Sequence, residues 1–309
     1  MNPKNTAIMK IAKNMYLASN FMSPIIVKRF SLSLYDVPMN QFLERYKRIS
    51  LSELYHENTK LRRYQKEVSI STQIFSTPEM LASTSLAAPK RSGKKVPLPK
   101  NDLSLNENVG DVLRTRRSIR EFGKNSISIM DLSKLLYYTN GITERLQYKL
   151  QFRDVETKVD LPLRASPSGG ALYPIDIYVA VLNVQNITRA IYFYDVEDHS
   201  LVLINEEVEK LISSFVPFSQ ETSSIKDSCL IIMFVANFFR TKLKYGERGY
   251  RYVLQESGHM AQNVYIASTA LKLAAVAVDG FYDDEINSIL GVDGVEEAIV
   301  YAVVVGNQK

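Results

Sequence analysis

The sequence predicts an α+β domain in which strands joined by hairpins form a sheet flanked by helices. Three strand-like segments follow one another at residues 174–184, 189–196 and 199–205, and the acidic turn DVEDH joins the last two. Segments with the spacing of amphipathic helices lie on both sides of this run instead of between its strands. This order favours antiparallel hairpins over a doubly wound parallel sheet, and no internal repeat is present.

The first third of the chain predicts short helical or irregular pieces, of which residues 51–68 are the most helix-like. Residues 86–102 are rich in Lys, Pro, Ser and Gly, a composition typical of an exposed linker. We therefore expect two regions, a basic N-terminal region over 1–105 and a compact domain over 106–309. Within the domain, helical spacing predicts helices at 108–117 and 128–141, the second with Gly141 as its C-cap.

In the second half of the chain, segments with helical spacing alternate with segments that have the pattern of strands. A long helix is expected over most of 245–273, with Met260, Val264, Ala267 and Leu271 on one buried stripe. The remaining expected elements are a helix at 205–215, a buried strand at 227–237, a strand into a turn at 274–280, a short helix at 283–291 and a closing strand at 296–306.

Composition excludes several classes of protein. Cys229 is the single cysteine, so neither a disulfide framework nor a cysteine cluster for zinc or iron–sulfur is available. The three histidines, His56, His199 and His259, are too far apart in sequence for a local metal motif. No apolar run approaches the roughly 18 residues of a membrane span, and lysines interrupt the N-terminal apolar residues, so a cytoplasmic protein is expected.

Charge is spread unevenly along the 309 residues. Residues 1–100 hold 17 basic and 6 acidic side chains, a net charge of +11, whereas the rest of the chain carries −6. The first third is either a solvated basic surface or a docking surface for an acidic peptide or protein. Nucleic acid is not expected as a partner, because the basic residues form no known binding motif.

The segment RASPSGGALYP (164–174) is the first candidate site. Small residues allow another group to approach the backbone closely, and serines supply hydrogen-bond donors. It contains neither a phosphate-binding loop nor a dinucleotide-binding glycine motif. Ser166, Pro167, Ser168 and Gly170 therefore form either an ordinary turn or a cradle for a flat ligand.

The segment RTRRSIREF (114–122) is the second candidate. Arg116, Arg117 and Arg120 surround Ser118 at the end of a predicted helix. Arginine forks and a hydroxyl suit a phosphate group. The alternative is a basic helix end that complements the helix dipole.

Two further segments carry candidate chemistry. Lys244 and Tyr245 are adjacent, and such a pair can transfer protons if burial or a nearby cation shifts a pKa. The alternative is ordinary packing of the ring with its hydroxyl in water. Asp279 and Gly280 follow a buried strand, where a turn can present free backbone N–H groups, and the alternative is a plain turn that ends the strand.

Taken in order, these segments resemble the flavin-dependent nitroreductase superfamily. The resemblance covers about residues 106–306 and rests on RRSIREF, SPSGGALYP, Gln220, the Gln-Asn pair of HMAQN and VDGF. KYGERGYRY and the early YHENTKLRR are similar to the SagB-type branch, the azoline dehydrogenases that make thiazoles and oxazoles in ribosomal peptides.

This resemblance implies a nitroreductase-like mixed sheet and a homodimer with FMN at the subunit interface. The segment with Ser166, Pro167, Ser168 and Gly170 would run under the flavin ring. FMN is expected instead of FAD, because no segment resembles an adenine-binding unit. The other implied contacts are Arg116, Arg117, Ser118 and Arg120 at the phosphate, Gln220 as a polar contact, and the Asp279–Gly280 turn near flavin N5.

The branch implies oxidation of a peptide thiazoline or oxazoline, with Lys244 and Tyr245 as the catalytic pair. Its partners would be an azoline-containing precursor peptide and a complex containing a cyclodehydratase. Three alternatives stay open: a flavin-dependent reductase of dehydroamino acids in lanthipeptides, an inactive scaffold of a modification complex, and a generic nitroreductase.

Overall fold

The computed structural model describes residues 51–61, 91–152, 155–216 and 222–309. Its internal contacts divide the chain into two units, residues 1–60 and 61–309. The described element of the first unit is helix α3 (Leu51–Asn58). It covers the first eight residues of the helix expected at 51–68 and ends at Asn58, since residues 59–61 are not helical. Residues 62–68 lie outside the described part, as do most of the basic residues of the first third.

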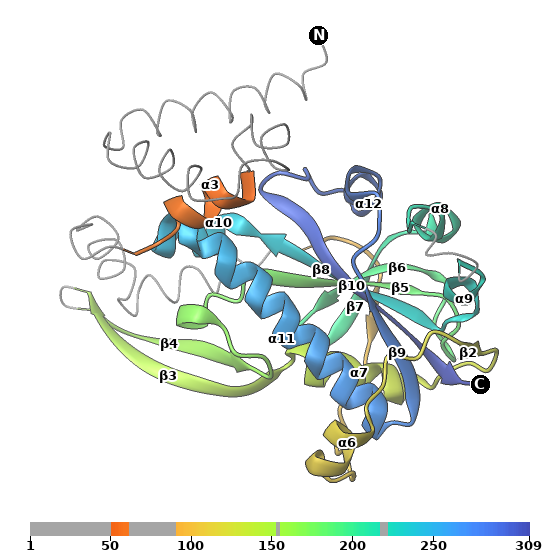
Figure 1. Cartoon of the computed structure of the whole chain (residues 1–309). Helices are drawn as coiled ribbons and strands as arrows, with labels where there is room; N and C mark the ends of the chain where they lie inside the picture. The colour runs from red at the N-terminus through yellow and green to blue at the C-terminus, as the bar shows by residue number, and fades with distance from the viewer. Residues whose placement is uncertain (1–50, 62–90, 153–154, 217–221) are drawn as a thin grey trace, which may run out of the picture. The chain divides into compact units, whose positions relative to one another are not determined.

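An eight-stranded sheet runs through the second unit (Figure 1). Its order is β1-β7-β6-β5-β8-β10-β2, and β9 also pairs with β10. Every ladder between these strands is antiparallel, so the expectation of a mixed sheet was wrong. The strands are β1 (Lys95–Pro97), β2 (Phe122–Gly123), β5 (Ile175–Val181), β6 (Ala190–Asp195), β7 (Ser200–Asn205), β8 (Leu230–Asn237), β9 (Leu273–Val278) and β10 (Glu297–Gln308).

Helices cover both faces of the sheet. Alternate residues of the buried strand β5 point to opposite faces, so Ile177 and Val179 belong to one core, and Tyr178 and Ala180 to the other. The first core includes residues of α7 and α11, and the second includes residues of α8 and α12. The helices are α6 (Val109–Thr115), α7 (Ile129–Asn140), α8 (Val208–Ser213), α9 (Thr222–Asp227), α10 (Phe238–Tyr245), α11 (Gly249–Ala270) and α12 (Asp283–Leu290), with short 3-10 turns η1 (Gly169–Ala171) and η3 (Gly246–Arg248).

Two regions differ from the expected elements. Residues 95–97 of the predicted linker form β1, which pairs with β7, and Leu98 beside it is buried. Residues 142–164, for which no element was expected, form a long antiparallel hairpin, β3 (Ile142–Phe152) and β4 (Val155–Arg164). This hairpin forms a separate two-stranded sheet. It leads directly into residues 164–174, called the glycine-containing segment below.

The helix expected over most of 245–273 begins instead at Gly249, and a separate helix, α10, precedes it. The side chain of Asn237 caps α10 by accepting from the Arg240 amide. Gly246 has φ of +56°, a conformation that favours glycine and turns the chain between the two helices. The buried stripe of α11 is confirmed for Met260, Val264 and Ala267, while Leu271 is only partly buried.

A buried ion pair fastens α10 to the sheet. Arg240 on α10 is 4% exposed, and its guanidinium donates to both carboxylate oxygens of Asp176 on β5, at 2.9 and 3.2 Å. The same guanidinium donates to the Tyr173 carbonyl at 2.9 Å. Lys244 lies one turn after Arg240 and therefore on the same helix face. The ion pair thus sets where the end of α10 lies.

Asp176→Ala should destabilise the protein by about 3–5 kcal/mol, because it leaves the Arg240 guanidinium buried without a carboxylate. Urea unfolding followed by circular dichroism measures the loss. The matched control is Glu121→Ala, which breaks an exposed pair with Lys309 and should cost less than about 1 kcal/mol. Equal costs in the two variants would contradict the role given to the buried pair.

Candidate functional site

The glycine-containing segment between β4 and β5 adopts a strained conformation. Gly170 has φ of +70°, and Ala171 and Tyr173 have φ of +54° and +45°. An L-residue in this left-handed region costs roughly 1–2 kcal/mol. Such strain persists only where surrounding contacts hold the backbone in place, and it is concentrated at functional sites.

Several contacts hold this segment. Ser168 Oγ accepts from the Tyr173 amide at 2.8 Å, and Ser166 Oγ donates to Asn140 Oδ1 on α7 at 2.7 Å. The Arg164 amide donates to the Tyr173 hydroxyl, and the Arg164 guanidinium lies 4.7 Å from the centre of the Tyr173 ring. Arg240 holds the Tyr173 carbonyl. These contacts therefore fix both ends of the glycine-containing segment to the rest of the fold.

Lys244 and Tyr245 lie directly against Gly170. A Cβ atom at position 170 would be 2.8 Å from both the Lys244 amino nitrogen and the Tyr245 hydroxyl oxygen. Lys244 is 6% exposed, and burial lowers the pKa of its amino group. Burial raises the pKa of the Tyr245 phenol, as do the nearby Tyr252 and Glu256. The structure thus brings together two sequence candidates that are 74 residues apart.

A third titratable group, Glu256 of α11, joins them. It is 6% exposed, and its Oε1 accepts from the Gly169 amide at 2.9 Å. Burial raises the pKa of its carboxyl to about 7, although hydrogen bonds from Gly169 and the Ser168 side chain oppose the shift. The Tyr252 ring packs edge-on against Tyr245 at 4.9 Å, so aromatic rings line this part of the site.

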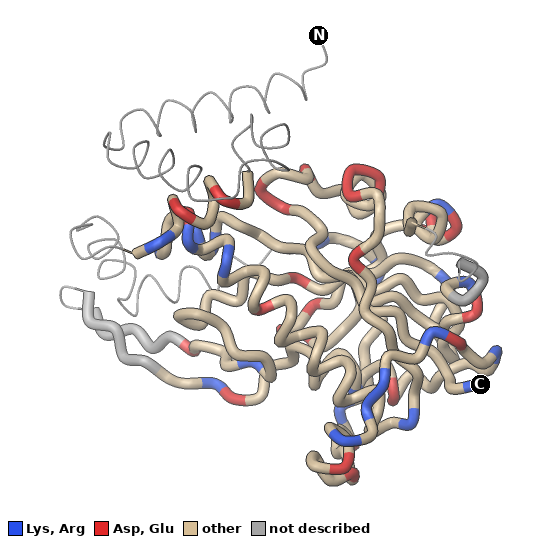
Figure 2. Tube along the Cα trace, viewed as in Figure 1, with Lys and Arg blue, Asp and Glu red and all other residues tan. Residues whose placement is uncertain are grey.

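Arg116 and Ser118 form a second group, at the end of α6. Ser118 Oγ lies 3.1 Å from the Tyr265 hydroxyl, and the Arg116 guanidinium lies 5.1 Å from the centre of the same ring. The Ala277 amide donates to this hydroxyl at 2.7 Å, which fixes Tyr265 against β9. Figure 2 shows the basic residues of α6 and the segment after it.

The remaining sequence candidates lie as follows. Arg117 and Arg120 are exposed, and the Arg117 guanidinium donates to the carbonyls of Arg114 and Arg116. Pro167 is exposed beside the buried Ser166. Asp279 is exposed and Gly280 half-buried in the turn after β9, and the Gly280 carbonyl accepts from the Val216 amide. Gln220 lies outside the described residues.

Helix α11 separates the two groups of contacts. Glu256 contacts the glycine-containing segment, and Tyr265 contacts Ser118. These residues are nine positions apart, which is two and a half helical turns and about 13 Å along the axis. Their side chains therefore leave α11 on opposite sides.

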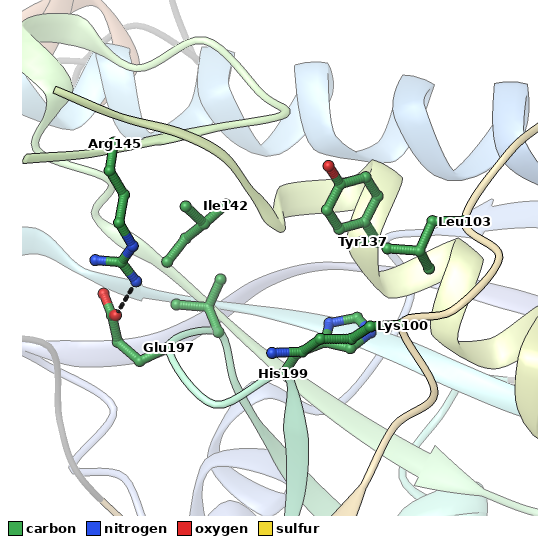
Figure 3. Close-up of a pocket in the computed structure, with 8 residues that line it drawn as sticks. Lys100, Leu103, Tyr137, Ile142, Arg145, Glu197 and His199 are labelled. Carbon is green, nitrogen blue, oxygen red and sulfur yellow. Dashed lines mark hydrogen bonds and ion pairs between the residues drawn. The ribbon is translucent and has the colours of Figure 1, made fainter.

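A separate pocket of about 200 Å³ opens beside the start of β3 (Figure 3). The buried His199 lies at its wall with Tyr137, and Arg145 pairs with Glu197 at 2.5 Å. Both ring nitrogens of His199 have hydrogen-bond partners, Ser133 and Tyr194, and burial lowers its pKa to about 4. These two contacts fix the imidazole between α7 and β6. None of the sequence candidates lines this pocket.

The model of the family described as "Nitroreductase family" matches residues 113–307. The chain belongs to this family. Its members typically bind FMN, and the chain is accordingly a nitroreductase-family oxidoreductase. The antiparallel sheet flanked by helices agrees with the family's α+β fold.

Two curated proteins are similar in sequence. A putative nitroreductase of Methanocaldococcus jannaschii is 38% identical over 180 residues, which cover 58% of this chain and 82% of that protein. The trifolitoxin-processing protein TfxB of Rhizobium leguminosarum bv. trifolii is 29% identical over 150 residues. That match covers 46% of this chain and only 39% of TfxB.

Solved structures share the fold. A putative nitroreductase from Ralstonia eutropha has a TM-score of 0.56 at 21% identity, covering 72% of this chain and 93% of that one. One from Anabaena variabilis has a TM-score of 0.55 at 23% identity, covering 70% and 42%. The Escherichia coli microcin synthetase McbBCD complex, with truncated pro-MccB17 bound, has a TM-score of 0.51 at 20% identity, covering 85% and 99%.

Over the described part of the chain, no group of three or more His, Cys, Asp or Glu side chains could hold a metal ion. No helix among the same residues is long and apolar enough to span a membrane.

Sequence reasoning missed three residues that build the site. Glu256, Tyr252 and Arg240 are ordinary charged or aromatic residues of helical segments, and no local pattern marks them. A carboxylate at a position that helical spacing would bury was the available signal for Glu256, since it lies one turn before the buried Met260. Its partner, the Gly169 amide, is 87 residues away.

Glu256→Gln should stabilise the protein in a pH-dependent way. The folded-state pKa of Glu256 is raised above its unfolded value, so ionisation weakens the fold as pH rises from about 4.5 to about 7. The glutamine variant lacks this loss. Its stability relative to wild type should rise by up to about 3 kcal/mol between pH 4.5 and 7.5.

Urea unfolding at several pH values, without added ligand, tests this expectation. Glu247→Gln is the control, because Glu247 is an exposed carboxylate on the neighbouring turn, paired with Lys242. This control should follow wild type at every pH. A Glu256→Gln curve parallel to wild type would show that Glu256 does not titrate differently in the folded state.

Proposed function

We propose that the chain is an FMN-dependent azoline dehydrogenase, which oxidises thiazoline or oxazoline rings of a ribosomally made peptide to the aromatic azoles. The observation that carries the proposal is the position of Lys244 and Tyr245 against Gly170. A pair suited to proton transfer thus lies against a segment bare enough for a flat ring.

The residues present fit FMN. Ser166, Pro167, Ser168 and Gly170 form a segment with little side-chain bulk, and any Cβ at Gly170 would intrude on the Lys244 and Tyr245 end groups. Arg116, Arg117, Ser118 and Arg120 offer the guanidinium and hydroxyl donors that a phosphate requires. Asp279 and Gly280, with Gln220, complete the proposed contacts. When bound, FMN would supply the two-electron acceptor for the hydride.

The proton of the azoline ring needs a base from the protein. The lowered pKa of Lys244 raises the fraction of neutral amine, which is the form that accepts a proton. The raised pKa of Tyr245 keeps its phenol protonated, so its O–H can donate to the substrate or orient it. We therefore assign Lys244 as the base and Tyr245 as the orienting donor.

The two groups of contacts support a site shared between two copies. The residues around Gly170 contact one side of α11, through Glu256, and those around Arg116 contact the opposite side, through Tyr265. One flavin, however, must meet donors at both its ring and its phosphate. In a homodimer, the ring segment of one copy can face the phosphate group of the other. We propose this arrangement for the FMN site.

Two of the similar proteins support a peptide as substrate. One is named as a trifolitoxin-processing protein, and the other belongs to a synthetase complex that holds a truncated precursor, pro-MccB17. By analogy, we propose that this chain acts on an azoline-containing precursor peptide within a complex that contains a cyclodehydratase. The basic region of residues 1–105 is the proposed docking surface for that complex.

Lys244→Ala and Tyr245→Phe should each keep FMN yet slow azoline oxidation by roughly 10²–10⁴-fold, the usual scale of general acid–base catalysis. Because the two side chains act on one proton transfer, the double variant should be scarcely slower than either single variant. The measurement is anaerobic bleaching of the flavin absorbance after a thiazoline peptide is added.

Lys242→Ala is the matched control on the same helix, since Lys242 pairs with Glu247 instead of facing Gly170. It should bleach at the wild-type rate. If Lys244→Ala and Tyr245→Phe also bleach at that rate, the pair is structural. If wild type bleaches with NADPH but not with the thiazoline peptide, the reaction is a reduction in the opposite direction.

Gly170→Val should lose FMN. A branched side chain would strain the backbone at φ of +70° and displace the Lys244 and Tyr245 end groups, against which the ring is proposed to lie. Gly258→Ala is the control, because no atom lies within 4 Å of the added Cβ. Flavin content per purified chain, read from absorbance, compares the two. A fully yellow Gly170→Val protein would contradict the proposed cradle.

A further inference from the structure

One buried titratable group has no part in the reaction proposed above. The Glu256 carboxyl lies under the glycine-containing segment, with Oε1 2.9 Å from the Gly169 nitrogen. The Ser168 side chain also hydrogen-bonds to it. Both partners belong to the segment that carries Gly170, so this carboxyl holds the stretch that also meets Lys244 and Tyr245.

We propose that Glu256 is a positioning residue of the cofactor site, whose carboxylate sets the affinity for FMN by holding the 168–170 segment against Lys244 and Tyr245. This inference rests on the proposed function in one respect only, the binding of FMN by that segment. It does not depend on which substrate is oxidised.

The segment needs such a restraint because its backbone is strained. Gly170 and Ala171 both have positive φ, and within this turn the Ala171 amide donates to the Ser168 carbonyl at 3.1 Å. Ser168 is held through Tyr173, and Gly169 is held through Glu256. An ionised carboxylate accepts from an N–H about twice as strongly as a neutral oxygen does. The hydrogen bond to Gly169 therefore strengthens when Glu256 ionises, although burying the charge lowers the stability of the whole fold.

The surroundings of Glu256 determine when it ionises. Arg164 at the end of β4 favours the charged form, and burial opposes it. Tyr245 of α10 faces the carboxyl as a neutral phenol, and Tyr252 packs beside it from α11 itself. Burial is the largest influence and raises the carboxyl pKa to about 7, so the charge changes within the ordinary range of cellular pH.

The test is FMN affinity as a function of pH. Apoprotein is titrated into FMN between pH 6 and 8, and binding is followed by quenching of flavin fluorescence. The wild-type affinity should rise about fivefold more over this range than the affinity of Glu256→Gln, which cannot gain the charge. Because the FMN phosphate titrates equally with both proteins, their difference isolates Glu256.

Two controls complete the design. Glu247→Gln, which changes an exposed carboxylate, should keep the wild-type pH dependence. Ser168→Ala removes a proposed FMN contact and the second hydrogen bond to the carboxyl, so it should weaken FMN binding at every pH and most at high pH. It also replaces Glu256→Gln if that variant does not fold. The visible spectrum of bound FMN should shift with pH in wild type and stay constant in Glu256→Gln.

The outcomes separate the two proposals. Equal pH dependence of FMN affinity in wild type and Glu256→Gln overturns the positioning role, whatever the enzyme oxidises. Loss of the dependence in Glu256→Gln, together with no bleaching by a thiazoline peptide, supports the positioning role and overturns the azoline dehydrogenase. A protein that binds no FMN at any pH overturns both.

Discussion

The site depends on the buried ion pair between Arg240 and Asp176. One guanidinium joins three parts of the chain, because it donates to the β5 carboxylate and to the Tyr173 carbonyl from its place on α10. A buried charge that loses its partner is expensive, so these three parts cannot separate without a large loss of stability. Lys244 follows on the same helix face. The ion pair therefore sets the distance between the proposed base and the segment beneath it.

The same region keeps its titratable groups away from bulk water, and burial acts on each in the direction that favours its neutral form. The pKa of Lys244 falls, that of Tyr245 rises, and that of Glu256 rises to about 7. Groups with shifted pKa values that converge on one bare segment are typical of a functional site. His199 shows the contrasting case, since both its ring nitrogens are hydrogen-bonded within the core and none of the candidate residues lines the pocket beside it.

The sequence match shows the family, whereas the substrate depends on the side chains of the site. The nitroreductase family is shown by the match over residues 113–307, and the solved structures above share only the architecture with this chain, at 20–23% identity. One architecture supports many reactions, so the substrate must be argued from side chains. Here those side chains are Lys244 and Tyr245 at the end of α10, a helix that Asn237 caps at its start and Gly246 ends.

Local pattern was enough to predict the α+β class, most helices and strands of the second unit, and the arginine, glycine and Lys-Tyr segments. These features depend on neighbouring residues, through side-chain periodicity and turn chemistry. The β3–β4 hairpin was missed although Leu146, Tyr148, Leu150 and Phe152 alternate with polar residues, a strand pattern. Only the tertiary structure decided that Lys244 and Tyr245 meet Gly170, that Glu256 holds Gly169, and that α11 separates this group from Arg116 and Ser118. Those contacts join residues about 70–150 positions apart, and their geometry follows from how helices pack on the sheet, which no local pattern encodes.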